Sequence, residues 1–346
     1  MKSYICRNVE ALAAYTPGEQ PKIPGIVKLN TNENPYPPSP AVGEALKNFD
    51  WHRLRLYPDP VFKLLRDRIA AIHACTPNQV FIGNGSDEIL ALSTRAFVEN
   101  DGSIGYFCPS YSLYPVLAEI RGAEKRPVEL DEKFGWRMPE GYQADLFFIT
   151  NPNAPTSLLY PKYTVQQFTA GFDGVVLIDE AYADFAPDNC MSLAIAKGNT
   201  NTLVMRTLSK SFSLAGLRFG YVVGPENLIA ALYKIKDSYN MDMLAQAVAI
   251  EALHDLDGMF ANVRKITDTR KRLTRILREM DWTVLDSASN FLFARPPNGN
   301  GEEAFKKLRL KNIFVRYFPG PRTGEYIRIT IGTDAEVDKL VAVLKE

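Results

Sequence analysis

The stretch that decides the fold spans residues 175–218 and reads VVLIDEAYADFAPDNCMSLAIAKGNTNTLVMRTLSKSFSLAGLR. It contains two runs rich in apolar, β-branched residues, 175–178 and 202–206, and each run leads into ionisable side chains. Short apolar runs of this kind are typical of strands that are buried on both faces. We therefore expect two neighbouring strands of a parallel sheet, with polar residues where each strand ends.

Apolar runs continue on both sides of this stretch, where they alternate with helix-like segments. Further buried strands are expected at 79–82, 103–107, 146–150 and 221–223, and helices at 87–99, 114–121, 162–170 and 227–236. Alternation of strands and helices predicts an α/β fold, with a three-layer domain around a mostly parallel sheet. We assign residues 39–240 to this large domain.

The carboxyl-terminal part, residues 241–346, has a different pattern of expected helices and strands. Helices are expected at 244–256 and 259–280, followed by short strands at 282–285, 291–294, 314–317 and 326–331. The second helix is long and basic, and its interspersed acidic residues favour a solvated face. Residues 1–38 are expected to form an extended arm. We group this arm with residues 241–346 as a smaller α+β domain.

Composition places the chain among soluble globular proteins. Forty basic residues balance forty acidic ones, so no net field attracts nucleic acid or an anionic membrane. The sequence contains no apolar run near the ~20 residues that span a bilayer, and residues 1–10 lack the apolar core of a signal peptide. The four cysteines are scattered, which argues against disulfides and metal sites and favours a cytoplasmic protein.

Ionisable residues at the predicted strand ends are the candidates for chemistry, since ligands of α/β sheets bind there. Asp179 follows four buried aliphatic residues, where a carboxylate is costly unless a cation faces it, although a helix cap is the simpler interpretation. Lys210 stands where the next strand ends, between two small serines. Arg218 lies in an apolar, glycine-rich setting, and its planar guanidinium suits a phosphate.

Two further signals are weaker. Residues 83–87 place glycines before a helix, whose first N–H groups and dipole favour an anion, although the carboxylate of Asp87 opposes one. Residues 151–156 form a polar turn after another strand. Each feature alone is compatible with a structural role. Together they supply an anion cradle, an acid, an amine and a cation, which a phosphorylated electron-sink cofactor requires.

These motifs resemble those of the fold-type I pyridoxal-phosphate aminotransferases. The resemblance rests on Gly85–Glu88, Pro109–Tyr111, Asn151–Thr156, Asp179–Tyr182 and Ser209–Arg218, in the family's order along the chain. Within this superfamily the sequence is most similar to the histidinol-phosphate aminotransferases, through Leu29–Tyr36, Leu56–Asp59, Ser289–Phe291 and Ile327–Gly332.

The resemblance implies four roles around the ring of a pyridoxal 5′-phosphate cofactor. Lys210 would form a Schiff base with it and move the proton of the substrate Cα, and burial and Arg218 would favour its neutral form. Asp179 would pair with the ring nitrogen and keep it protonated. Tyr182 would hydrogen-bond the ring oxygen O3′, and Tyr111 would stack on the ring.

The resemblance also implies binding residues. The cofactor phosphate would be held by Gly85, Ser86, Asp87, Ser209 and Arg218, with Tyr57 reaching across from the partner subunit of a homodimer. Substrate would meet Arg328, with Asn34, Tyr36 and Asn290 nearby. No metal is implied.

One position departs from the family pattern. Many relatives have Asn directly before the Pro-Thr pair, where it bonds O3′, and Gly after the Thr, whereas this chain has Ala154 and Ser157. Two alternatives remain: either Asn153 takes this role after a shift of the loop, or Tyr182 holds O3′ without it. We expect Asn153 to take it.

The implied activity is a ping-pong transamination that converts L-histidinol phosphate and 2-oxoglutarate into imidazole-acetol phosphate and L-glutamate, with Arg328 serving both anionic substrates. An aromatic amino-acid aminotransferase or a threonine-phosphate decarboxylase on the same scaffold is the alternative. A DNA-binding regulator is disfavoured, because it would need a further helix-turn-helix segment of ~60 residues. A non-enzyme would also be expected to lose Lys210, Asp179 or Arg218, and all three are present.

Overall fold

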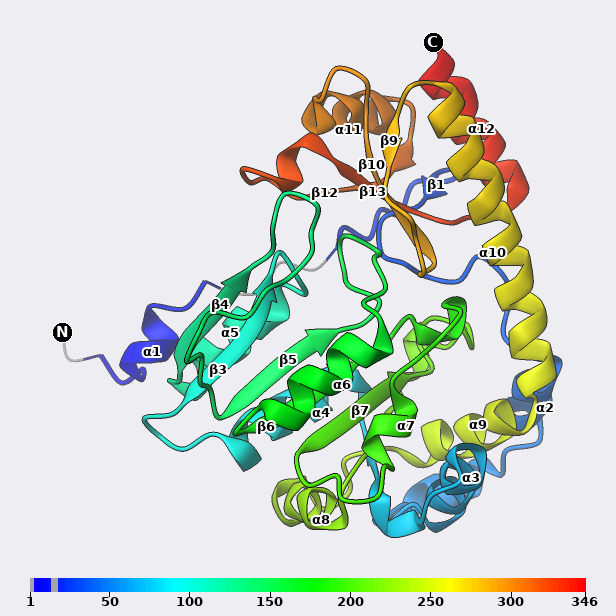
Figure 1. Cartoon of the computed structure of the whole chain (residues 1–346). Helices are drawn as coiled ribbons and strands as arrows, with labels where there is room; N and C mark the ends of the chain where they lie inside the picture. The colour runs from blue at the N-terminus through cyan, green and yellow to red at the C-terminus, as the bar shows by residue number, and fades with distance from the viewer. Residues whose placement is uncertain (1–2, 14–17) are drawn as a thin grey trace.

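The computed structural model of the chain describes residues 3–13 and 18–346. Figure 1 shows a large domain built on one sheet and a smaller domain above it, connected along one side by the long helix α10 (Leu256–Glu279). Within the described ranges, no helix is both long and apolar enough to cross a membrane.

The large domain is built on a seven-stranded sheet of order β2-β8-β7-β6-β5-β3-β4. Neighbouring strands are parallel except at β8, which is antiparallel to both β2 and β7. The mostly parallel sheet predicted from sequence is therefore confirmed. The strands are β2 (Val80–Gly83), β3 (Ser103–Cys108), β4 (Glu124–Glu129), β5 (Leu146–Thr150), β6 (Val175–Asp179), β7 (Thr202–Thr207) and β8 (Gly220–Val223).

Strand β4 was not expected from the sequence. It lies at the edge of the sheet, where it pairs with β3 alone. Its sequence, EKRPVE, has only Val128 fully buried, because an edge strand exposes its remaining side chains to solvent. A search for apolar runs detects central strands and misses an edge strand of this kind.

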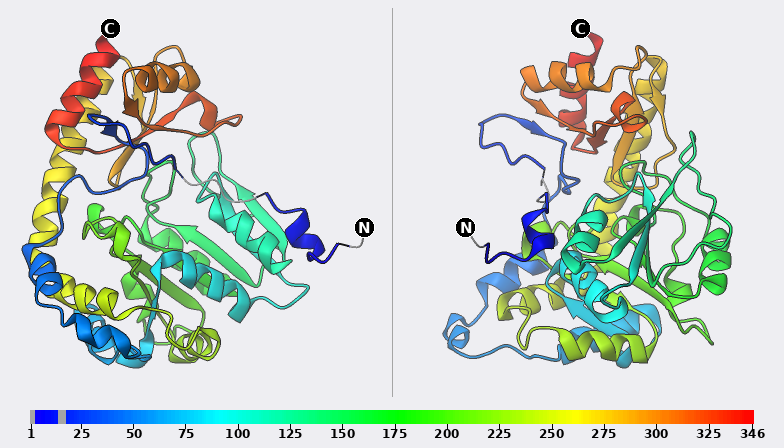
Figure 2. Two further views of the ribbon diagram at one scale, coloured as in Figure 1. Left: turned by 180° about the vertical axis from the view of Figure 1, so that it is seen from behind. Right: turned by 90° about the vertical axis from the view of Figure 1, so that its left-hand side faces the viewer.

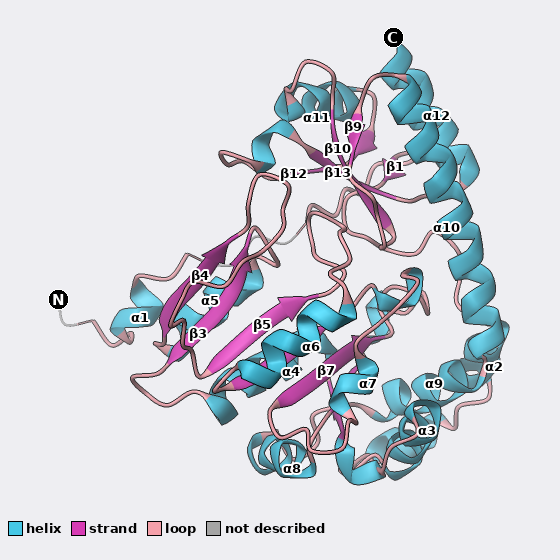
Figure 3. Ribbon diagram, in the orientation of Figure 1, coloured by secondary structure: helices cyan, strands magenta, loops and turns pink. Residues whose placement is uncertain are grey.

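Helices cover both faces of the sheet and complete three layers (Figure 3). The alternation of side chains in β5 shows how the layers are divided: Phe147 and Ile149 pack into one core, Leu146 and Phe148 into the other. One face is covered by α4 (Gly85–Phe97), α5 (Leu113–Arg121) and α8 (Glu226–Ile235), the other by α3 (Lys63–His73), α6 (Lys162–Gly171), α7 (Met191–Ala194) and α9 (Met243–His254).

Helix α9 lies beyond the boundary at residue 240 that the sequence suggested. Its buried residues, among them Val248 and Ala252, belong to the same core as β5 and α3, and α2 (Pro40–Lys47) packs against it. The buried apolar residues of α10, from Met259 to Leu277, belong to the core of the small domain, so the packing favours a boundary between α9 and α10.

The small domain contains a four-stranded antiparallel sheet of order β12-β13-β10-β9, backed by α10 and two further helices. Its elements are β9 (Thr283–Val284), β10 (Phe291–Arg295), α11 (Gly301–Leu310), β12 (Arg316–Tyr317), β13 (Ile327–Thr330) and α12 (Asp334–Lys345). Among the residues that the structure describes there are also five 3₁₀ turns: Trp51–Arg55, Pro77–Gln79, Ala183–Phe185, Ala215–Leu217 and Thr323–Glu325.

The amino-terminal arm packs against the small domain. Its strand β1 (Val27–Lys28) pairs in parallel with β11 (Ile313–Phe314), and Leu29 is buried in the small-domain core. The arm also contains a short helix, α1 (Arg7–Glu10), which was not expected and which lies beside α5 of the large domain (Figure 2). The arm thus runs past both domains before the large domain begins.

Candidate active site

The candidate site is a cavity at the carboxyl edge of the large sheet. Strands β2, β3, β5, β6 and β7 run in one direction, so the loops that follow them meet at this edge. The arm and the small domain close the other side of a space of about 200 Å³. The residues predicted from sequence that line it are Ser86, Asp87, Tyr111, Asp179, Tyr182, Ser209, Lys210, Arg218 and Arg328.

Lys210 follows β7, and its Nζ donates a hydrogen bond to the main-chain oxygen of Thr31 in the arm at 3.3 Å. Burial lowers the pKa of this amine to about 8, and the positive charge of Arg328 acts in the same direction. From the sequence we expected burial and Arg218 to lower this pKa. Arg218 does lower it, but by less than Arg328 does. An amine with this pKa is neutral in a useful fraction of molecules near neutral pH, as a nucleophile or base requires.

Asp179 ends β6 and is 4% exposed. Its carboxylate accepts hydrogen bonds from the hydroxyl of Tyr114 at 3.0 Å and from the backbone N–H of Ala181 at 3.1 Å. Burial raises the pKa of this carboxyl to about 6 against the opposing effect of those two donors. A buried carboxylate of this kind is stabilised by a cation placed opposite it.

Tyr114 was missed by the sequence reasoning. Its side chain is fully buried, and its hydroxyl holds Asp179 in place from helix α5. The signal in the sequence was slight, since an aromatic residue on the inner face of an amphipathic helix is usually only part of the core.

An anion-binding corner lies where α4 begins. Gly85 opens this helix with φ +81°, and a Cβ atom at this position would lie 2.7 Å from Nη2 of Arg218. Glycine is therefore required for the guanidinium to lie across the helix amino terminus. Ser86 and Asp87 supply N–H groups of the first turn, which carry no partner within the helix.

The carboxylate of Asp87 is paired with two donors at this corner. It accepts from Arg218 Nη2 at 3.2 Å and from the hydroxyl of Tyr111 at 3.3 Å. The sequence suggested that the carboxylate of Asp87 would oppose a bound anion. In the structure this carboxylate orients Arg218, while the backbone N–H of Asp87 remains at the end of the helix.

Asn153 does not lie where we expected. Its side chain is fully buried, its Oδ1 accepts from Ser110 at 2.9 Å, and its Nδ2 donates to the hydroxyl of Thr156 at 2.9 Å and to the main-chain oxygen of Pro109. These contacts hold the turn together, and Ala154 lines the cavity instead. The geometry thus favours the alternative in which Tyr182 acts without Asn153.

Four residues were expected to contact the substrate, and three of them, Asn34, Tyr36 and Asn290, are not among the residues that line the cavity. Asn34 donates to the main-chain oxygens of Lys210 and Ser211, both at 3.1 Å, and thereby supports the lysine loop. Asn290 donates to the main-chain oxygen of Asn32 at 3.0 Å. The ring of Tyr36 lies under the ammonium group of Lys265 at 4.8 Å.

The fourth, Arg328, does line the cavity, and the structure places a second arginine with it. Arg328 comes from β13, where its Nη2 donates to the main-chain oxygen of Asn30 at 2.8 Å. Arg316 of β12 pairs with it in register, and Arg316 and Phe318 also line the cavity. The sequence did not reveal Arg316, because only strand pairing brings residues 316 and 328 together.

A buried ion cluster supports the floor of the site. Arg206 in β7 donates from Nε to Glu180 and from Nη1 to Asp184, both at 2.7 Å, and Glu180 is 1% exposed. The hydroxyl of Ser211 donates to the other oxygen of Asp184. The cluster therefore ties the loop that follows Asp179 to the loop that carries Lys210.

Tyr57 does not belong to this cavity within the chain. Its side chain is 78% exposed, and its ring stacks on that of Tyr239 at 4.3 Å. It lines a different and larger hollow, which α2, α3 and α9 surround.

Comparison with known proteins agrees with this geometry. The model of the family "Aminotransferase class I and II" matches residues 24–344. Histidinol-phosphate aminotransferase of Syntrophotalea carbinolica is 43% identical over 98% of both chains, and histidinol-phosphate aminotransferase 2 of Thiobacillus denitrificans is 45% identical over 97% of this chain and 96% of its own.

A solved structure is similar along nearly the whole chain. Histidinol-phosphate aminotransferase from Sinorhizobium meliloti, in complex with pyridoxal-5′-phosphate, superimposes with a TM-score of 0.88 at 25% identity, over 99% of this chain and 97% of that one. The family model thus matches nearly the whole chain, and relatives more than 40% identical cover almost all of it. This chain therefore belongs to the aminotransferase class I and II family.

Proposed function

We propose that this enzyme transfers the amino group of L-histidinol phosphate to 2-oxoglutarate, with pyridoxal 5′-phosphate as its cofactor. The observation that carries the proposal is the cavity in which the amine of Lys210, with its pKa lowered to about 8, lies among Asp179, Arg218 and Arg328. The relatives that match over the full length are named histidinol-phosphate aminotransferases, which supports this choice of substrate.

The residues present fit the cofactor. The buried carboxylate of Asp179 accepts from two neutral donors, and a protonated ring nitrogen would supply the cation that such a carboxylate favours. The missing Cβ of Gly85 leaves room for Arg218 at a helix amino terminus, where a phosphate would bind. When bound, the cofactor supplies an electron sink that lowers the cost of removing a proton from the substrate Cα.

The residues of the chain then have distinct tasks. Lys210 would bind the cofactor, and its neutral amine would take the proton from the substrate Cα and return it from the ammonium form that results. Asp179 keeps the proton on the ring nitrogen, and Tyr114 holds Asp179 in place. Arg218, with the first N–H groups of α4, anchors the phosphate. The arm and the small domain limit the access of water to the cavity.

Substrate recognition is assigned to Arg328 and Arg316. Both guanidinium groups line the same side of the cavity, so together they match the phosphate of one substrate and the carboxylates of the other. The rings of Phe318 and Phe291 lie 5.2 and 5.3 Å from the Arg328 guanidinium and hold it in place.

The substrate assignment is tested by absorbance spectra of the cofactor-loaded enzyme. L-Histidinol phosphate is expected to convert the spectrum completely, and Arg328→Gln is expected to lower kcat/KM for it by about 10- to 100-fold, the value of a lost charge-assisted hydrogen bond. Conversion by L-phenylalanine but not by histidinol phosphate would move the enzyme to the aromatic aminotransferases. Release of carbon dioxide from threonine phosphate would identify the decarboxylase instead.

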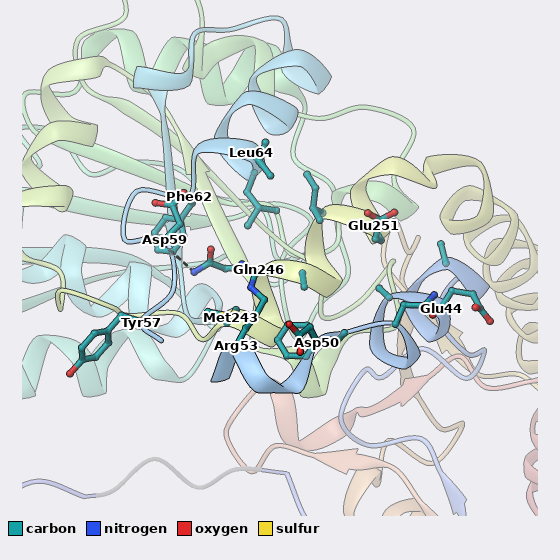
Figure 4. A pocket seen from close by; sticks show the side chains of 17 residues that line it. Glu44, Asp50, Arg53, Tyr57, Asp59, Phe62, Leu64, Met243, Gln246 and Glu251 are labelled. Atoms are coloured by element: carbon teal, nitrogen blue, oxygen red, sulfur yellow. Dashed lines mark hydrogen bonds between the residues drawn. The ribbon is translucent and has the colours of Figure 1, made fainter. Parts of the chain in front are cut away.

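We further propose that the enzyme is a homodimer in which Tyr57 reaches the cofactor phosphate of the partner subunit. Tyr57 is one of the residues that line the hollow drawn in Figure 4. The volume of this hollow is about 730 Å³. Large apolar side chains are exposed on the same segments, including Trp51 at 68% and Leu64 at 72%. Exposed apolar surface of this extent is typical of a protein interface.

The dimer is tested by replacing Leu64 beside this hollow. Leu64→Glu is expected to give a monomer with little activity, because it places a charge in the interface. The matched control is Leu310→Glu, since Leu310 is 86% exposed on α11 of the small domain. Light scattering after gel filtration measures the mass of each variant, and a monomeric wild-type enzyme with full activity would refute the proposal.

A further inference from the structure

Asn32 lies in the arm, lines the cavity and is 1% exposed. Its side-chain Nδ2 donates to the hydroxyl of Tyr182 at 3.0 Å, and its Oδ1 accepts from the hydroxyl of Thr330 at 3.1 Å. Its main-chain oxygen accepts from Asn290 Nδ2 at 3.0 Å. Since Thr330 and Asn290 belong to the small domain and Tyr182 follows β6, Asn32 connects both domains at the cavity.

The backbone of Asn32 fixes the direction of its side chain. Its φ of 55° lies in the left-handed region, which asparagine adopts more readily than most residues. Its backbone N–H donates to the Thr330 hydroxyl at 3.0 Å, so this hydroxyl has its own proton to give to Asn32 Oδ1. The amide oxygen is thus held towards Thr330, and the amide nitrogen towards Tyr182.

This orientation determines how Tyr182 can act. An amide NH₂ group only donates hydrogen bonds, so the oxygen of Tyr182 accepts at this contact. The phenolic proton of Tyr182 is therefore directed away from Asn32, towards a different acceptor. On the other side of the loop, Ala154 presents only a methyl group to the cavity, and the amide of Asn153 is held in its turn.

We propose that Asn32 is a positioning residue that makes Tyr182 a hydrogen-bond donor to the ring oxygen of the cofactor. Many relatives have an asparagine at the position of Ala154, where its amide bonds the ring oxygen. Asn32, which belongs to the arm, thereby performs part of this role through Tyr182. The inference rests on the proposed function, which places the ring oxygen beside Tyr182. A ring oxygen that receives a hydrogen bond is less basic, so Asn32 lowers the pH at which the bound cofactor titrates.

Two substitutions separate hydrogen-bond direction from packing. Asn32→Gly keeps the left-handed backbone without strain and removes the amide. Asn32→Asp keeps the shape and the acceptor for Thr330, but its carboxylate can only accept from Tyr182 and so turns the phenolic proton away from the cofactor. The readout is a pH titration of the absorbance of the cofactor-loaded protein. Its midpoint is expected to rise by about one pH unit in Asn32→Gly and further in Asn32→Asp.

The reverse order, with Asn32→Gly shifted more than Asn32→Asp, would indicate a packing role and overturn the proposal. Because a new carboxylate also raises the midpoint through its charge, both substitutions are repeated in a Tyr182→Phe background. There Asn32→Gly is expected to have no further effect, and the shift in Asn32→Asp is expected to shrink. Undiminished shifts without the tyrosine hydroxyl would contradict the proposal. If Asn32→Asp does not fold, the proposal is tested by the midpoint shift of Asn32→Gly alone, compared between the wild-type and the Tyr182→Phe backgrounds.

Failure of the inference and failure of the proposed function give different results. If Tyr182→Phe shifts the midpoint but neither Asn32 variant does, the role of Asn32 is refuted while that of Tyr182 stands. If Tyr182→Phe leaves the midpoint unchanged, Tyr182 does not contact the ring oxygen and the inference falls with it. If the wild-type protein shows no cofactor spectrum, both are refuted. Thermal unfolding of the cofactor-free variants confirms that each one is folded.

Discussion

Replacement of Lys210 by alanine is expected to remove the covalent attachment of the cofactor and to lower kcat by about 10⁴-fold or more. The methyl group can neither bond to the cofactor nor carry the proton of the substrate Cα, and positioned acid–base groups contribute up to about 10⁴-fold by themselves. Absorbance spectra measure attachment, and single-turnover kinetics measure proton transfer.

The matched control for this variant is Lys210→Arg, which keeps the positive charge but cannot lose a proton. It is expected to be as inactive as Lys210→Ala, because the neutral amine is what the reaction uses. Added small amines are expected to restore part of the activity of Lys210→Ala and none of that of Lys210→Arg. Activity of either variant within ten-fold of the wild type would contradict the assignment of Lys210.

The pH dependence of cofactor attachment follows from the same amine. Its folded pKa of about 8 lies below the usual lysine value of 10.5, so the rate of attachment to cofactor-free enzyme is expected to rise with pH and to level off above about 8. Arg328→Gln removes a cation that lowers this pKa, so the midpoint is expected to move upward. A midpoint that stays in place would show that burial alone sets the pKa of Lys210.

Asp179→Asn is expected to lower kcat by about 10³- to 10⁴-fold while leaving the cofactor bound. A neutral amide cannot stabilise the proton on the ring nitrogen, and the loss of one oriented carboxylate in an active site commonly has effects of this size. Stopped-flow measurement of the substrate half-reaction tests this. The control Asp179→Glu keeps the charge and is expected to retain more activity than Asp179→Asn.

Stability distinguishes this effect from misfolding. Burial raises the pKa of Asp179 to about 6 from 3.8, so the folded state binds more protons than the unfolded state between these values. The contribution of Asp179 to the stability of the cofactor-free protein therefore falls as the pH rises through this window. At neutral pH, cofactor-free Asp179→Asn is expected to have a Tm equal to or above that of the wild type, and a clearly lower Tm would contradict this reasoning.

The central fold and many of the residues that line the cavity could be predicted from the sequence because both depend on local patterns. The six predicted strands are apolar runs, and the carboxyl ends of the five that run in one direction lie on one edge of the sheet. Asp179, Lys210 and Arg218 could be placed together for this reason. The edge strand β4 gave no such signal, since most of its side chains are solvated.

Other features depended on contacts between residues far apart in the sequence. The partner of Asp179 is Tyr114, 65 positions away, and Asn32 meets Tyr182 across 150 positions. Asn153 was placed wrongly relative to the cavity, because the direction of one amide in a turn depends on its neighbours Ser110 and Thr156. No local pattern specifies such a direction.

The sequence by itself determined the layered architecture, the order along the chain in which polar residues follow the strands, and the chemical types of the side chains proposed to bind the cofactor. Only the tertiary structure decided which side chains face the cavity, that Arg316 lies beside Arg328, and that the arm brings Asn32 to Tyr182. The physical reason is that secondary structure and burial follow from the periodicity of a short segment. The direction of a polar side chain is set by hydrogen bonds and charges from other segments, which meet only when the chain has folded.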